Sequence, residues 1–299
     1  MTLIPSYEES TSPTLPGLLL RTDQLDAVVQ VFNTEGGGAT GVLIGPRLVL
    51  TAKHVVAERT PERANAVSTG SISVGFGPSL FVPRTVIRAE AVEVMNPGQP
   101  ISVHVLRRDS PLSAFMDLAH DDLALISLPR VVEDVAPIPV SAIAPSIGQG
   151  LQLSGYGSMS TWTVAANKAR GWAIGTLTHY ARDASGFMVR ATGSLERDTG
   201  PGPGDSGGPA ISADPSGAAR VVGIVTGGQW MFPGLRSMRV ETYVSVAYHF
   251  EWIRGAAARL LGGAWTDDKV VSAPPSSPVV PLLVGGAVVA AILILAGSD

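Results

Sequence analysis

The stretch Gly-Pro-Gly-Asp-Ser-Gly-Gly-Pro at residues 202–209 is the most informative part of this 299-residue chain. Glycine and proline surround a single serine, Ser206, and glycine allows backbone conformations that other residues avoid. Such a turn exposes the serine oxygen and lets nearby backbone N–H groups point toward an anion. The stretch therefore predicts a serine nucleophile whose transition state is stabilised by backbone amides.

Two further stretches supply the side chains that a serine nucleophile needs. Thr-Ala-Lys-His at residues 51–54 follows an apolar run, and the small residues leave room for the His54 imidazole to meet a partner. Asp121 and Asp122 open a second apolar run, over residues 123–128. Taken alone, a histidine after a strand is more often packed or at the surface, and an aspartate there more often starts a turn.

Composition excludes several classes of protein. Hydrophobic residues make up 45% of the chain and charged residues 15%, which excludes a disordered polar chain. The net charge of −4 provides no basic field, so we expect no nucleic-acid partner. The absence of cysteine excludes disulfides, thiolate zinc sites and a cysteine nucleophile. We expect no metal or organic cofactor, because no metal-ligand spacing connects the other histidines, His104, His120, His179 and His249.

The central part of the chain has an all-β pattern. The 34 glycines and 23 prolines indicate many turns. Short apolar or alternating runs predict strands at residues 27–32, 41–44, 48–51, 71–76, 85–92, 123–128, 151–154, 173–177, 186–191 and 221–226. Residues 245–261 instead place Trp252, Ala256 and Leu260 at helical spacing, and Gly262 follows as a stop.

Both ends of the chain differ from this pattern. Residues 1–23 are rich in Ser, Thr and Pro and predict a flexible arm, and residues 263–278 form a Pro/Ser-rich linker. Residues 279–296 carry no charge, and at about 1.5 Å per residue they span about 27 Å, enough for a membrane helix. A buried C-terminal helix is the alternative, which the linker disfavours. Lys269 before the span places the main domain in the cytoplasm.

Together, the three motifs resemble those of the trypsin-like (chymotrypsin-fold) serine peptidases. The family's Thr-Ala-x-His matches residues 51–54, its Asp-Leu-Ala-Leu matches residues 122–125, and its Gly-Asp-Ser-Gly-Gly-Pro matches residues 204–209. The chain order His, Asp, Ser is also that of the family. The resemblance covers residues 24–262, and it is greatest to the disulfide-free bacterial branches.

The resemblance implies a fold of two antiparallel six-stranded β-barrels. The first barrel would comprise residues 24–135, and the second barrel with the terminal helix residues 136–262, with the active site in the cleft between them. A separate transmembrane helix would follow the linker.

The resemblance also implies a mechanism acting on protein or peptide substrates. Ser206 would attack the peptide carbonyl, His54 would take its proton, and Asp122 would orient the imidazole, with Asp121 as the competing assignment. The N–H groups of Gly204 and Ser206 would form the oxyanion hole.

Substrate binding is expected at Gly200, Thr226, Gly227 and Gly228. Gly200 lies where trypsin has an acid, which implies a pocket open to apolar or medium side chains. The Thr226 hydroxyl matches a position that often supports the buried acid.

Two departures from the family pattern stand out. The chain lacks the Ile/Val-rich start whose ammonium pairs with the aspartate before the nucleophile, so Asp205 needs another partner. Activity could then depend on an activating partner protein. His54 and Asp122 lie 68 residues apart, which predicts an insertion within residues 96–110.

Two other functions fit part of the sequence. Residues 204–208 also match Gly-x-Ser-x-Gly, the nucleophile elbow of α/β-hydrolases, for which Asp214 and His249 would complete a triad. Because no helix can open at Gly-Gly-Pro, and residues 51–54 stay unexplained, this alternative is the weaker one. The other alternative is a catalytically silent, membrane-anchored binding module on a peptidase fold.

Overall fold

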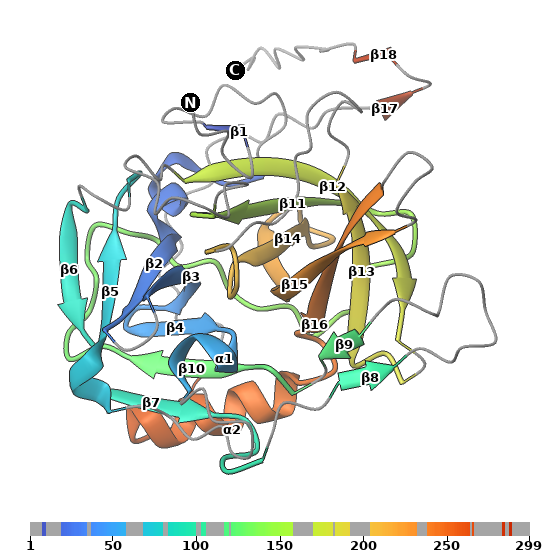
Figure 1. The fold of residues 1–299 in the computed structure, drawn as a ribbon. Coiled ribbons are helices and arrows are strands. Elements are labelled where there is room, and N and C mark those ends of the chain that lie inside the picture. Colours follow the sequence, from blue (N-terminus) through green and yellow to red (C-terminus); the bar gives the residue numbers. More distant parts are fainter. Residues whose placement is uncertain are drawn as a thin grey trace, which may run out of the picture.

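Two antiparallel sheets account for most of the fold and stand side by side (Figure 1). The structure is a computed structural model. It describes residues 8–9, 19–34, 37–57, 68–79, 83–99, 103–105, 117–119, 121–157, 170–181, 183–191, 204–231, 238–263, 265, 283–284 and 287–288.

In chain order the elements are β1 (Glu8–Glu9), η1 (Thr22–Ala27), β2 (Val28–Asn33), β3 (Gly37–Gly45), β4 (Leu48–Thr51), α1 (Lys53–Val56), η2 (Thr69–Ser71), β5 (Ile72–Phe76), β6 (Thr85–Arg88), β7 (Ala91–Val94), β8 (Val103–Val105), β9 (Asp117–Ala119), β10 (Ala124–Ser127), β11 (Gly150–Gly155), β12 (Gly171–Tyr180), β13 (Gly186–Ala191), β14 (Pro209–Ala213), β15 (Ala219–Met231), β16 (Met238–Ser245), α2 (Phe250–Leu261), β17 (Leu283–Val284) and β18 (Ala287–Val288).

The first sheet has the strand order β6-β5-β2-β3-β4-β10-β7. Its edge strands, β6 and β7, are two parts of the run predicted at residues 85–92, which bends at Ala89 and Glu90. The Ala89 N–H donates to Ile72 O at 3.0 Å, and the Glu90 N–H donates to Ser127 O at 2.8 Å. The bend therefore links β5 to β10 and closes the sheet into a barrel. The six strands predicted become seven because this run is broken.

The second sheet closes through direct pairing of β12 with β13. The six strands β11 to β16 form this barrel, and β1 pairs with β12 as an additional edge strand. The two-barrel, all-β fold expected from the sequence is thus confirmed. Strands β8 and β9 form a small sheet of their own within the connection from β7 to β10, and only β8 lies within residues 96–110, where the sequence predicts an insertion.

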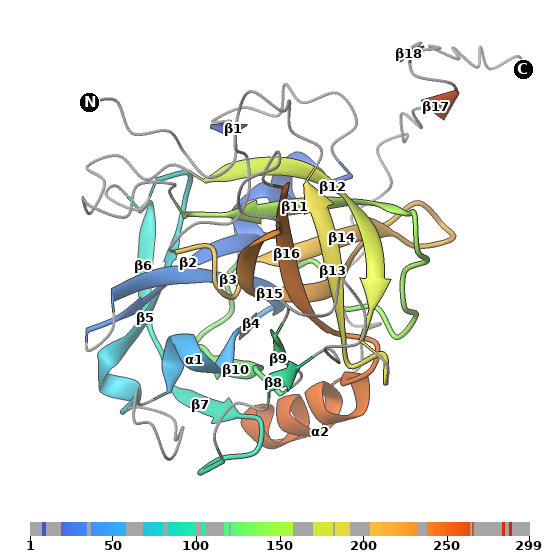
Figure 2. The same ribbon diagram turned by 45° about the vertical axis from the view of Figure 1, so that its right-hand side comes forward.

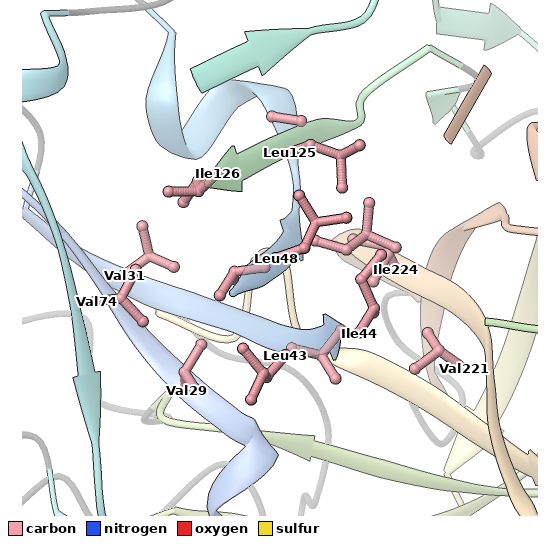
Figure 3. Close-up of a cluster of buried hydrophobic side chains, with 14 of the residues drawn as sticks. Val29, Val31, Leu43, Ile44, Leu48, Val74, Leu125, Ile126, Val221 and Ile224 are labelled. Atoms are coloured by element: carbon pink, nitrogen blue, oxygen red, sulfur yellow. The ribbon is translucent and has the colours of Figure 1, made fainter. Parts of the chain in front are cut away.

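Each barrel has its own apolar interior, and β15 connects the two. The close-up in Figure 3 shows side chains of the first barrel, including Val29, Leu43 and Leu125, with Val221 and Ile224 of β15 beside them. All five are fully buried. The second interior includes Phe187 and Tyr243, whose rings stack with centroids 5.5 Å apart. Burial of such surface is the main force that holds the barrels together.

Helix α2 belongs to the C-terminal part of the chain but packs against the first barrel. Its buried residues Ile253, Ala256 and Ala257 lie on one face, which joins the core of the first barrel. The helix runs beneath β7 and β10 in both views (Figure 2). It ends at Gly262, whose φ of 68° is the left-handed conformation that glycine adopts at low cost. The predicted C-terminal helix is confirmed, although it begins at residue 250 rather than 245.

The structure moves two predicted boundaries. Leu20 is buried in the core and the Leu19 N–H donates to Gln152 Oε1 at 2.9 Å, so the arm of residues 1–23 ends before Leu19. Trp265, placed in the linker, packs against the first core, and its Nε1 lies beside Gly45. The rest of the linker after Gly263 lies outside the described residues.

The predicted membrane helix, residues 279–296, lies outside the described residues except for β17 and β18, which pair with each other. No helix in the described part of the chain is both long and apolar enough to cross a membrane. A membrane helix at residues 279–296 stays a prediction.

Candidate active site

The register between β4 and β10 brings the histidine motif to the acidic motif. Thr51 at the end of β4 pairs with Ala124 at the start of β10, and the two strands run antiparallel. Residues after Thr51 therefore lie alongside residues before Ala124. The chain turns into α1 directly after β4, and this turn carries His54 back toward Asp122.

Asp122 contacts His54 at two points. His54 Nδ1 lies 2.7 Å from Asp122 Oδ2, and the His54 N–H donates to Asp122 Oδ1 at 2.8 Å. The Asp122 side chain is 2% exposed, whereas the His54 side chain is 31% exposed. A carboxylate can only accept, so the proton of the neutral imidazole lies on Nδ1 and leaves Nε2 as an acceptor. This arrangement makes His54 chemically able to act as a general base.

Asp121 faces different partners. The Asn96 side-chain amide donates to Asp121 Oδ2 at 3.3 Å. Of the two adjacent aspartates, the structure thus brings Asp122 to His54 and directs Asp121 toward the turn after β7.

Ser206 lies in a turn that is held from both barrels. In the second barrel, the Gly207 N–H donates to Val225 O at 2.8 Å, and the Val225 N–H donates to Gly208 O at 2.9 Å. In the first barrel, Thr40 on β3 donates its N–H to Ser206 O at 2.9 Å and its hydroxyl to Gly204 O at 2.7 Å. The position of Ser206 therefore depends on correct docking of the two barrels.

Gly207 lies directly against the strand that leads to His54. Its φ is 83°, and a Cβ built there would collide with Thr40 O and Thr51 Oγ1 and come within 3.1 Å of Ala52 N. Only glycine fits both the backbone conformation and the close approach. Ser206 is consequently held next to the segment that ends at His54.

The backbone amides predicted as the oxyanion hole, those of Gly204 and Ser206, belong to this turn. The Gly207 N–H donates to Val225 O, and the Gly208 N–H donates to Asp205 O. Within the described residues, the N–H groups of Gly204 and Ser206 donate to no backbone acceptor. Binding of a substrate oxygen by the amides of Gly204 and Ser206 stays a prediction.

The Asp205 carboxylate accepts a hydrogen bond from the backbone of the second barrel. The Asp205 side chain is fully buried, and the Gly157 N–H donates to Asp205 Oδ1 at 2.7 Å. A Cβ at Gly155 or at Gly157 would collide with the carboxylate, so these two glycines form a close-fitting cradle. A hydrogen bond to an ionised carboxylate is among the stronger kinds in proteins.

Comparison with known proteins agrees with this geometry. The family model described as Trypsin matches residues 21–253. The chain belongs to the trypsin family of serine peptidases. It is 27% identical over 236 residues to a cercarial protease of Schistosoma mansoni, covering 76% of this chain and 83% of that protein. It is 24% identical over 242 residues to the alpha- and beta-fibrinogenase OhS1 of Ophiophagus hannah, covering 78% and 81%.

The predicted substrate-binding residues of this family member are placed unevenly. Gly200 lies outside the described residues. Gly227 and Gly228 lie on β15, where they pair with Thr242 and Glu241 of β16. The Thr226 hydroxyl lies 3.4 Å from the Thr242 hydroxyl, and among the described residues no hydrogen bond joins it to Asp122, the acid that it was expected to support. Membership of a disulfide-free bacterial branch stays a prediction.

Residues that the sequence analysis did not single out also build the site. Thr40 binds the serine turn, Gly157 binds Asp205, and Lys53 is buried beside His54. Lys53 and Thr51 stood within the histidine motif, but nothing in the local pattern indicates burial of an ammonium group. Across the described residues, no group of three or more His, Asp or Glu side chains could hold a metal ion.

Proposed function

We propose that this chain is a serine endopeptidase that cleaves protein substrates through His54, Asp122 and Ser206. The observation that carries the proposal is the two-point contact between Asp122 and His54, at 2.7 Å and 2.8 Å. Membership of the trypsin family supports it. So does the turn of Ser206, which is bound to Thr40 of the barrel that carries His54.

The proposed reaction proceeds through an acyl-enzyme. Ser206 Oγ attacks the carbonyl carbon of the substrate while His54 Nε2 accepts the hydroxyl proton. The N–H groups of Gly204 and Ser206 bind the oxyanion of the tetrahedral intermediate. His54 then protonates the leaving amine, and water hydrolyses the ester on Ser206 by the same steps. Asp122 holds the Nδ1 proton and stabilises the imidazolium.

The substrate would lie along β15 beyond Val225, at Thr226, Gly227 and Gly228, and Gly200 would leave the side-chain pocket open to apolar or medium-sized residues. The names of the two relatives, a cercarial protease and a fibrinogenase, support a protein substrate. A cleavage profile on a peptide library tests this part of the proposal. A strict preference for lysine or arginine would contradict the open pocket.

Labelling with a fluorophosphonate probe tests the nucleophile directly. We expect the wild-type chain to be labelled and Ser206→Ala to be unlabelled. Asp122→Asn is expected to lower the hydrolysis rate about 10⁴-fold, because the imidazole loses its orientation. The matched variant Asp121→Asn should keep most of the activity near pH 8. Absence of labelling in the wild type would overturn the proposal in favour of a catalytically silent binding module.

We further propose that residues 279–296 anchor the chain to a membrane, with the peptidase domain on the cytoplasmic side. The support is the uncharged apolar composition of these residues after a Pro/Ser-rich linker. Expressed in cells, the full chain should stay with membranes after alkaline carbonate washing, and Ile292→Asp combined with Leu295→Asp should release it. Digestion of the domain by external protease in sealed, right-side-out cells would contradict the cytoplasmic placement.

A further inference from the structure

A lysine side chain is buried at the base of the candidate site. Lys53, the residue before His54, has no exposed surface. Its Nζ donates to Asn96 O at 3.0 Å and to Gln99 O at 2.9 Å, both in the turn that follows β7. Removing an ammonium group from water costs free energy unless opposite charge and hydrogen bonds compensate. A buried lysine at this place therefore requires an explanation.

Two carboxylates provide the compensating charge. Asp121 and Asp122 are each 2% exposed, and they are adjacent in the chain. Burial lowers the pKa of Lys53, while the nearby charges of Asp121 and Asp122 act to raise it. Like charges held close together in a protein interior repel each other, and a cation beside them offsets that repulsion.

The turn that binds Lys53 also binds Asp121. Asn96 accepts a hydrogen bond from Lys53 through its carbonyl and donates one from its side chain to Asp121 Oδ2 at 3.3 Å. Asn96 has a φ of 46°, a left-handed conformation that asparagine tolerates better than most residues. Lys53, Asn96 and Asp121 thus form one connected network behind the His54–Asp122 pair.

We propose that Lys53 is a positioning residue whose ammonium group balances the charge of Asp121, so that Asp122 alone sets the charge felt by His54. The inference rests on the proposed function for its catalytic consequence. The ammonium also fixes the turn at residues 96–99 against α1, through its two carbonyl partners.

Other charged groups on the surrounding elements are already paired at the surface. Glu93 of β7 forms an ion pair with Arg259 of α2. Oε2 of Glu90, just before β7, lies 3.6 Å from Nη1 of Arg47. On β2, the side chain that faces α1 is the neutral Asn33, which donates to Val55 O at 3.1 Å. In the described structure the charges that face Lys53 are therefore those of Asp121 and Asp122.

The proposal predicts shifts of opposite sign in two variants. Lys53→Gln removes the positive charge and keeps a donor for the carbonyls, so the pKa of the His54 imidazolium should rise by about one pH unit. Asp121→Asn leaves the lysine charge uncompensated, so the same pKa should fall by a similar amount. The double variant should return the pKa to near its wild-type value, because it removes one charge of each sign.

Two measurements separate this inference from the proposed function. NMR titration of labelled histidine rings, with the His54 signal assigned by its loss in His54→Gln, reports the pKa without any need for activity. The pH dependence of kcat/KM should show the same shifts in its acidic limb if the chain is a peptidase. NMR shifts in a chain that hydrolyses nothing would uphold the charge balance and reject the peptidase.

The control variant is Lys53→Arg, which keeps the charge and changes the packing. It should leave the His54 pKa within about 0.3 pH units of the wild type, even if its stability falls. Equal pKa values in the wild type and in Asp121→Asn, or shifts of the same sign in both single variants, would overturn the proposal. If Lys53→Gln fails to fold, the Asp121→Asn shift alone decides the outcome.

Discussion

The backbone amide of Gly157 donates a hydrogen bond of 2.7 Å to the buried carboxylate of Asp205, the residue before Ser206. The contact joins the end of β11 to the serine turn within the second barrel. Because the partner is a backbone group inside the folded chain, we expect the turn to keep its shape without a newly cut N-terminus. This relationship leads to the first prediction.

We expect activity without cleavage of the N-terminal segment, and loss of activity when the cradle of Asp205 is filled. In Gly157→Ala, the Cβ would collide with the carboxylate and displace the serine turn, so kcat/KM should fall at least about 100-fold. Gly150→Ala at the start of β11 is the control, since a Cβ built there meets no atom within 4 Å. Full activity of Gly157→Ala would contradict the role given to Asp205.

A second prediction concerns the close approach of Gly207 to the first barrel. Gly207 and Gly217 have nearly the same φ, 83° and 85°. A Cβ would collide with Thr40 O at Gly207 and meet nothing at Gly217. Gly217→Ala should lower the free energy of unfolding by about 1 to 2 kcal/mol through backbone strain alone. Gly207→Ala should lose about 1 to 3 kcal/mol more, as measured by urea unfolding, because of the collision. Equal losses of unfolding free energy in the two variants would argue against the contact.

Much of the architecture could be predicted because most strands are short apolar or alternating runs, separated by residues that favour turns. Two strands of the second barrel, β14 and β16, were missed for identifiable reasons. Strand β14 starts at Pro209, directly after two glycines that indicate a turn. Strand β16 contains Glu241, which is fully buried and accepts a hydrogen bond from the Tyr243 hydroxyl, whereas a charged residue in sequence suggests a surface loop.

Site residues could be predicted where a short motif indicates the chemistry. They were missed where the contact joins residues far apart in the chain. Glycines around Ser206 and small residues before His54 are local signals. The residues alone left Asp121 and Asp122 open, the resemblance to the family favoured Asp122, and the pairing of β4 with β10 brings Asp122 to His54. Thr40 was missed because its partner Gly204 lies 164 residues away and a threonine in a strand is common.

The Thr40 hydroxyl gives a third prediction. It donates to Gly204 O at 2.7 Å and accepts from the Tyr156 N–H at 3.0 Å, so it connects β3, the serine turn and β11. Thr40→Val keeps the shape of the side chain but leaves Gly204 O and the Tyr156 N–H without their hydroxyl partner. It should lower the free energy of unfolding by about 1 to 3 kcal/mol and kcat/KM at least about tenfold. Thr40→Ser keeps the hydroxyl and should retain most activity. Equal activity of both variants would show that the hydroxyl does not hold the turn.

The last prediction concerns the stability of the docked barrels at high pH. The buried Tyr156 hydroxyl donates toward Val28 O and Gly77 O, at 3.0 Å and 2.6 Å, and burial raises its pKa to about 12. In the unfolded chain this hydroxyl ionises near pH 10. Its contribution to the free energy of unfolding is therefore complete below pH 10 and is lost between pH 10 and about 12.

Tyr156→Phe should lower the free energy of unfolding by about 1 kcal/mol at pH 8, and its difference from the wild type should be smaller at pH 11. Urea unfolding at both pH values measures this, with Tyr248→Phe as the control because the Tyr248 side chain is exposed. A difference between Tyr156→Phe and the wild type that stays constant from pH 8 to pH 11 would contradict the assignment.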